Sequence, residues 1–208
     1  MNLCVFGCLL TDYGMQIKQE MLSWLSSEYK VFCVDQEPPG TLFEYPGIYY
    51  AAKLAIDANH PVLYVHTKGA ANKIPSYHTK MMSSKFNVPS HAKPEDCQRV
   101  IRNLWRHEFT GNRLNEYLRA VNVNTPMVAC PYTGPSKTTW WNGFIINPLA
   151  AKILLPKLQI STYRWYYERL FANFADIQVC GLRRNNLTFD TIDNDIPYWN
   201  DIWSFYDK

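Results

Sequence analysis

Short apolar runs alternate with amphipathic stretches along the first third of the chain. The runs predict strands at residues 3–10, at 29–34 and from 62 onward, and the stretches between them predict helices at 13–26 and 47–59. Strand–helix–strand units of this kind form right-handed crossovers between parallel strands. We therefore expect an α/β fold in which helices cover both faces of a mostly parallel central sheet.

The pattern is less regular in the remainder of the chain. A strong helix is expected over residues 95–120, with Gly111 as a candidate interruption, followed by strands at 127–130, 144–146 and 177–180 and by helices at 148–155 and 163–174. From residue 190 onward five aspartates alternate with aromatic residues, so we expect this segment to pack on the body of the protein. The length of 208 residues is typical of a single domain.

Composition narrows the range of functions. The formal net charge of +3 is too small to indicate nucleic-acid binding. The segment between positions 66 and 107 is nevertheless basic, with eight Lys or Arg residues and two acidic residues. That basic segment is either a solvated loop or a flap that faces phosphate, and a nucleic-acid-binding protein is a distant alternative because no recognition motif accompanies it.

The cysteines and the apolar runs indicate a compartment. None of the six cysteines forms a C-x-x-C pair, so each is expected to act as a small buried hydrophobe in a reducing environment. No apolar run approaches the roughly 18 residues of a membrane span, and no basic region precedes the first apolar run as in a signal peptide. These features predict a soluble, cytoplasmic protein without a transmembrane segment.

The end of the third predicted strand carries the strongest candidate site, His66-Thr67-Lys68-Gly69. Ligands of open α/β sheets bind beyond the carboxyl ends of the strands. Lys68 is suited to neutralise phosphate charge, and His66 can bind a metal or donate to a phosphate oxygen. Thr67 adds a hydroxyl, and Gly69 permits close approach of the backbone. The alternative is an ordinary polar strand end.

The chain resembles a known group at several points, and these share order and spacing from about Leu3 to Leu170. The points are Glu44-Tyr45-Pro46, the tract Tyr64 to Gly69, Trp105-Arg106, Trp141-Asn142-Gly143-Phe144 and Tyr166-Tyr167-Glu168. They are similar to motifs of small GT-A-like glycosyltransferases from bacterial capsule and surface-polysaccharide clusters and from large algal viruses. The resemblance implies a GT-A fold over residues 1–208, with a donor half at about 1–125 and an acceptor half at about 126–208. It also implies a nucleotide-sugar donor, a UDP-sugar by preference, and transfer to a glycan or glycoprotein acceptor.

One feature departs from that group. GT-A enzymes usually hold a divalent metal with an Asp-x-Asp at the strand end where this chain has His66-Thr67-Lys68, and the single Asp-x-Asp here is Asp193-Asn194-Asp195. Mn²⁺ or Mg²⁺ remains the expected cofactor, with His66 as a candidate ligand and the rest of the ligand set open. Because of this departure, a non-catalytic nucleotide- or glycan-binding module is the alternative to an enzyme.

Further candidate residues lie near other strand ends. Phe6 and Gly7 are expected to approach the nucleoside, Asp35 to accept the imide N–H of uracil, and Arg183 to reach the diphosphate, each against the plain alternative of a structural residue. Trp140, Trp141 and Asn142 follow a loop rich in Gly and Pro. Because tryptophan faces stack on sugar rings, these three residues are the expected acceptor wall.

Inverting transfer needs a base for the acceptor hydroxyl. Glu168 is the predicted base because it lies in an aromatic segment where burial would raise its pKa. The alternative is a surface glutamate paired with Arg164 or Arg169, and Glu44 and Glu108 are the other carboxylates in view. The sequence thus predicts a glycosyltransferase with a carboxylate base.

Overall fold

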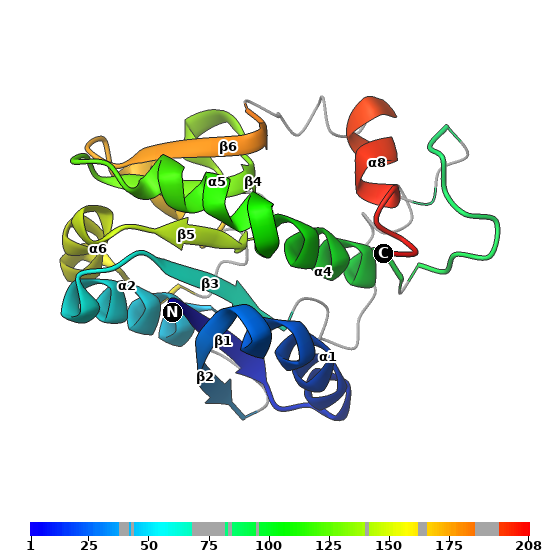
Figure 1. Ribbon diagram of the computed structural model, residues 1–208, viewed down its shortest axis with the longest axis horizontal. Coiled ribbons are helices and arrows are strands. Elements are labelled where there is room, and N and C mark those ends of the chain that lie inside the picture. Colours follow the sequence, from blue (N-terminus) through cyan, green and yellow to red (C-terminus); the bar gives the residue numbers. More distant parts are fainter. Residues whose placement is uncertain are drawn as a thin grey trace.

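The computed structural model describes residues 1–37, 42, 44–67, 82, 85–94, 96–139, 142–161, 166–185 and 196–208. Its centre is a six-stranded sheet with the order β2-β1-β3-β5-β4-β6 (Figure 1). The strands are β1 Asn2–Leu9, β2 Tyr29–Gln36, β3 Val62–His66, β4 Met127–Tyr132, β5 Phe144–Ile146 and β6 Gln178–Arg184.

The sheet is mixed. Strand β1 pairs in parallel with β2 and β3, and β4 pairs in parallel with β6. Strand β5 lies between β3 and β4 and runs antiparallel to both. The expected α/β class is confirmed, and the parallel pairing of the first three strands follows from their two helical crossovers.

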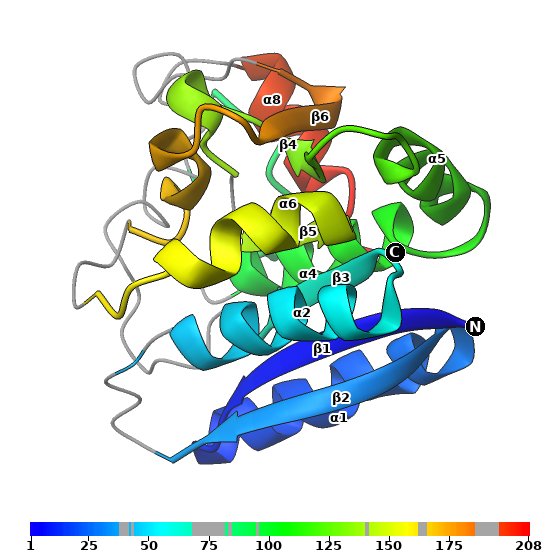
Figure 2. The same ribbon diagram turned by 90° about the vertical axis from the view of Figure 1, so that its left-hand side faces the viewer.

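Helices cover both faces of the sheet (Figure 2). They are α1 Asp12–Glu28, α2 Tyr45–Ala58, α4 Asp96–Glu108, α5 Gly111–Val121, α6 Pro148–Leu154 and α8 Ile196–Trp203. Helices α2 and α6 pack on one face, against side chains such as Val62 and Tyr64, whereas α1, α4 and α5 pack on the other, against Leu63 and Val65. Strand β3 is thus buried on both faces, as its continuous apolar run predicts. Among the described residues, none of these helices has the length and apolar character of a membrane span.

Local signals explain where several helices begin. The Thr11 side chain accepts a hydrogen bond from the Gly14 amide at the start of α1. Gly111, at φ +53°, is the first residue of α5, and residues 109–110 separate this helix from α4 within the stretch that the sequence predicts as one helix. The buried side chain of Asn147 caps α6 by accepting a hydrogen bond from the Ala150 amide. Its oxygen also accepts from the Met127 amide, and its NH₂ group donates to the carbonyls of Val121 and Thr125.

Two sequence predictions are wrong in detail. The expected helix at 163–174 is a turn at residues 166–169 followed by a 3-10 helix, Leu170–Asn173, with residues 162–165 outside the described part. The Glu168 carbonyl accepts a hydrogen bond from the Thr139 amide. In an α-helix this carbonyl would instead accept from an amide one turn further along the same helix. All six cysteines are free and four are buried, but Cys33 is exposed.

A buried ion network fastens the C-terminal helix to the sheet. The fully buried carboxylate of Glu108, at the end of α4, accepts from Arg183 of β6 at 2.6 Å and from Arg113 of α5 at 2.8 Å. Arg183 also pairs with Asp201 of α8, with 3.0 Å between Nε and Oδ2, and its guanidinium lies over the Phe205 ring. The described part of the acidic C-terminal segment, residues 196–208, therefore packs on the body.

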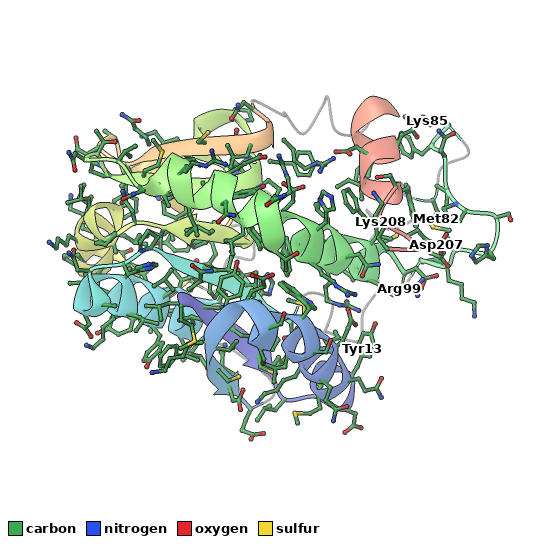
Figure 3. All side chains as sticks on the ribbon, viewed as in Figure 1. Tyr13, Met82, Lys85, Arg99, Asp207 and Lys208 are labelled. Atoms are coloured by element: carbon green, nitrogen blue, oxygen red, sulfur yellow. The ribbon has the colours of Figure 1, made fainter. Side chains whose placement is uncertain are left out.

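The same segment makes cation–π contacts close to the end of the chain, where Arg99 and Lys208 lie (Figure 3). The Arg99 guanidinium lies 4.7 Å from the Tyr206 ring centre, and the Lys208 ammonium lies 4.5 Å from that of Phe205. Helix α8 consequently lies beyond the end of the sheet at which β3 finishes (Figure 1).

Candidate functional site

The sheet has a topological switch point at β1 and β3. The chain leaves β1 through α1 to reach β2 on one side, and then passes through α2 to reach β3 on the other side of β1. In open α/β sheets, ligands bind at such a point, beyond the carboxyl ends of the strands. The carboxyl end of β3 is His66, which is paired in register with Gly7.

Three polar side chains from separate elements meet at this strand end. A Glu44 carboxylate oxygen lies 3.5 Å from His66 Nε2, and the amide nitrogen of Asn142 donates to the other Glu44 oxygen. Glu44 immediately precedes α2, whereas Asn142 precedes β5. Asn142 is fully buried, and Glu44 keeps about a fifth of its side-chain surface (21%) exposed. The site thus combines a carboxylate, an imidazole and a fixed amide with access to solvent.

Two aromatic residues flank the His66 ring. Tyr64 lies parallel to it with ring centres 6.1 Å apart, and Trp105 of α4 is tilted against it at 5.6 Å. Both are fully buried, and neither the Tyr64 hydroxyl nor the Trp105 indole nitrogen hydrogen-bonds any described residue. Burial, together with the charges of Glu44 and Tyr167, raises the pKa of Tyr64 far above its ordinary value, so the hydroxyl stays protonated. Unsatisfied buried polar atoms are uncommon and are concentrated at functional sites.

Two glycines allow this close packing. A Cβ atom on Gly47 would lie 2.7 Å from the Tyr64 ring, and one on Gly143 would lie 2.4 Å from the Trp105 indole nitrogen. Any side chain at these positions would collide with the ring. The two glycines therefore bring the start of α2 and the turn before β5 over the end of β3.

Thr67 has a structural role at the same edge. Its hydroxyl accepts from the Leu9 amide at 3.0 Å, and its own amide donates to the Gly7 carbonyl at 2.9 Å. These bonds extend the pairing of β1 and β3 past the last ladder residues. Gly7 lies against Tyr64 and His66, and its expected approach to a nucleoside stays a prediction.

Other predicted donor residues have partners elsewhere. The Phe6 side chain is fully buried in the core on the α1 side of the sheet, so it cannot contact a nucleoside as expected. Asp35 is paired with Lys18 of α1, at 2.7 Å, and lies partly exposed at the end of β2. Arg183 pairs with Glu108 and Asp201 in the ion network. Neither of these two carboxylates belongs to the Glu44–His66–Asn142 cluster.

Glu168, the predicted base, is buried, with 7% of its surface exposed, in the turn before the 3-10 helix. Its backbone is tied to the site because Thr139 N bonds its carbonyl at 2.8 Å and the Asn142 amide donates to the Thr139 carbonyl at 3.3 Å. Lys68, Gly69, Trp140 and Trp141 lie outside the described residues.

The described residues do not make up a metal site by themselves. Glu44 and His66 provide two of the required ligand types, but within the described ranges no group of three or more His, Cys, Asp or Glu residues is arranged to hold a metal ion. The cluster can do acid–base chemistry without further partners, because a carboxylate can take a proton and an imidazole can donate one.

Sequence reasoning found His66 and Asn142 but left Glu44 as a secondary choice and gave Tyr64 and Trp105 no role. All three belong to motifs that carry the resemblance, Glu44-Tyr45-Pro46, the Tyr64 tract and Trp105-Arg106. Their recurrence beside His66-Thr67 and Asn142-Gly143 was the available signal.

Comparisons of the chain with protein-family models, with curated proteins and with solved structures give no match.

Proposed function

We propose that this protein transfers a sugar from a nucleotide-sugar donor, by preference a UDP-sugar, to a hydroxyl of a glycan acceptor, on a GT-A-like fold. The observation that carries the proposal is the meeting of Glu44, His66 and Asn142 beyond the carboxyl ends of β1 and β3. This is the position at which open α/β sheets bind their ligands. The motif resemblance supplies the reaction class.

The donor diphosphate is assigned to the tract that follows His66. The nucleoside diphosphate is the leaving group of the transfer and gains negative charge in the transition state. A lysine can neutralise that charge as a compact cation. Lys68 is two residues beyond His66 and is the proposed partner of the diphosphate. Mn²⁺ or Mg²⁺ would also stabilise the diphosphate charge, but the described residues do not complete a site, so no step is derived through a metal.

The first test is ligand-dependent thermal stability. UDP, GDP, CDP and their sugar conjugates are added one at a time, each with and without Mn²⁺ or Mg²⁺, and donor turnover is measured in parallel. A nucleotide at 100 times its Kd stabilises the folded state by about 2.7 kcal/mol, which corresponds to roughly 5–11 °C in a domain of this size. We expect a uridine nucleotide to give the largest shift.

Two variants make the test specific. Lys68→Ala should abolish donor turnover without lowering the melting point of the free protein. Lys53→Ala is the matched control, because Lys53 is an exposed residue of α2 paired with Asp57 and should leave both quantities unchanged. Turnover that survives in Lys68→Ala would contradict the assignment of the diphosphate. Nucleotide binding without turnover in the wild type would instead indicate a non-catalytic binding module.

A further inference from the structure

Glu44 occupies the N-cap position of α2 but does not cap that helix. Its backbone has helical angles, φ −92° and ψ −4°, rather than the extended angles typical of an N-cap, and its side chain makes no capping hydrogen bond. The carboxylate instead reaches across to the end of β3 and to the turn before β5. The positive end of the α2 dipole still lies beside it and favours the ionised form.

Asn142 is held in one orientation by its neighbours. It adopts φ +54°, a left-handed conformation that asparagine tolerates better than most residues. The Thr139 hydroxyl donates to its side-chain oxygen at 3.3 Å, and its backbone amide donates to the Thr139 carbonyl. With its oxygen engaged by Thr139, the amide NH₂ points to Glu44. This interaction fixes the carboxylate and stabilises its charged form.

Of the two partners at this strand end, Glu44 is the one that a hydroxyl group can reach. The His66 Nε2 atom is buried, whereas about a fifth of the Glu44 side-chain surface (21%) is exposed. A hydroxyl on that exposed side would donate to the carboxylate. The partly exposed Glu44 side chain leaves a path for such a group, whereas the residue Glu168 is almost completely buried.

We propose that Glu44 is the general base of the transfer and that Asn142 is a positioning residue for the Glu44 carboxylate. The assignment rests on the proposed function. The acceptor oxygen forms a bond to the anomeric carbon of the donor sugar, and the hydroxyl proton passes to Glu44 Oε1. The bond between the anomeric carbon and the diphosphate oxygen breaks, and its electron pair leaves with the nucleoside diphosphate. Glu44 then returns its proton to solvent.

The main experiment is Glu44→Gln, with Glu116→Gln as the control, because Glu116 is an exposed residue of α5 whose carboxylate pairs with Arg113 outside the cluster. Glu44→Gln should keep the thermal shift given by UDP and lose transfer by about 100-fold or more, the usual contribution of a positioned base. Glu116→Gln should retain transfer within a few-fold, and Glu168→Gln tests the rival base. Transfer retained in Glu44→Gln, or lost only in Glu168→Gln, would overturn the assignment.

Asn142→Ala gives an independent readout through the pH profile of kcat. The titratable described groups that face Glu44 are His66, Tyr64 and Tyr167. Because the Asn142 amide stabilises the Glu44 carboxylate, its removal should raise the pKa of the base and move the acid limb of the profile to higher pH. An unshifted limb would show that Asn142 has only a structural role.

The outcomes separate the base assignment from the proposed function. If Glu44→Gln lowers the melting point of the free protein, the direction of the Asn142→Ala shift decides the assignment. If the wild type transfers sugar and Glu44→Gln does too, only the base is wrong. If the wild type neither binds uridine nucleotides nor turns over a donor, the proposed function fails and the assignment falls with it.

Discussion

The Glu108 network offers the sharpest test of what holds this fold together. Glu108 is fully buried, and its carboxylate accepts hydrogen bonds from Arg183, Arg113 and Tyr117, which come from β6 and α5. The change Glu108→Gln keeps the shape of the side chain but removes its charge. Both arginines would then face a neutral amide at a fully buried position.

The expected cost can be estimated from burial. Removing one partner of a buried ion pair typically costs about 3–5 kcal/mol. The arginine side chains keep 20% and 30% of their surface exposed, so the lower end of that range applies, at about 3 kcal/mol. For a domain of this size that loss lowers the melting temperature by roughly 6–12 °C.

The assay is urea and thermal unfolding followed by tryptophan fluorescence. Glu116→Gln is the matched control, because Glu116 pairs with the same Arg113 but keeps 45% of its side-chain surface exposed. We expect this control to lie within about 0.5 kcal/mol of the wild type, since exposed ion pairs contribute little. A Glu108→Gln protein that matched the control would refute the claim that the network anchors α8.

The pH dependence of the same variant tests the cause. Burial raises the pKa of the Glu108 carboxyl, but hydrogen bonds from its neighbours outweigh this effect and hold the pKa below its ordinary value; the neighbours are Arg113, Tyr117, Arg183 and His107. A lowered pKa in the folded state stabilises the protein above the pKa of the unfolded chain, about 4.3. The stability gap between wild type and Glu108→Gln should therefore be full at pH 7 and shrink as the pH falls below about 4.3. A gap that stayed constant down to pH 3 would contradict an ionic origin.

Two further substitutions test close packing and capping. Gly143→Ala should lower the melting point and, on the proposed function, donor turnover as well. The reason is that a Cβ at 2.4 Å from the Trp105 indole must displace the ring or the turn. Unchanged stability and turnover would show that the ring and the turn can move apart at little cost. Asn147→Ala should cost about 2–4 kcal/mol in urea unfolding, since it leaves buried backbone groups without partners, whereas Thr11→Ala, which removes one cap at a more exposed site, should cost about 1 kcal/mol. Equal costs for the last two would argue that Asn147 acts only as a helix cap.

Much of the first half of the fold could be predicted from the sequence because its signals are local. The apolar runs that become β1, β2 and β3 are each separated by one amphipathic helix, and Thr11 marks a helix start through its hydrogen bond with the Gly14 amide in the same turn. The position of β5 is not a local property. Three apolar residues, Phe144–Ile146, insert antiparallel between β3 and β4, and nothing within such a short segment specifies which strands it will join.

The errors at individual residues have the same cause. Arg183 ends a strand run, which makes it a reasonable ligand for phosphate, but its partners Glu108 and Asp201 lie 75 and 18 residues away. The aromatic run at 163–174 has helical composition, yet Thr139 takes the Glu168 carbonyl from 29 residues upstream. Long-range hydrogen bonds of this kind override propensity and leave no trace in the local sequence.

The candidate site itself depends on two glycines, Gly47 and Gly143, whose lack of a side chain allows close packing. Gly47 lets the first turn of α2 press on the Tyr64 ring, which brings Glu44 to His66, and Gly143 lets the turn before β5 press on Trp105, which brings Asn142 to Glu44. The polar residues can be read from the sequence one by one, but their meeting requires both glycines to be opposite large rings from other elements. A glycine within three residues of a polar residue, as in Glu44 to Gly47 and in Asn142-Gly143, is therefore a more useful indicator of this site than the polar residue alone.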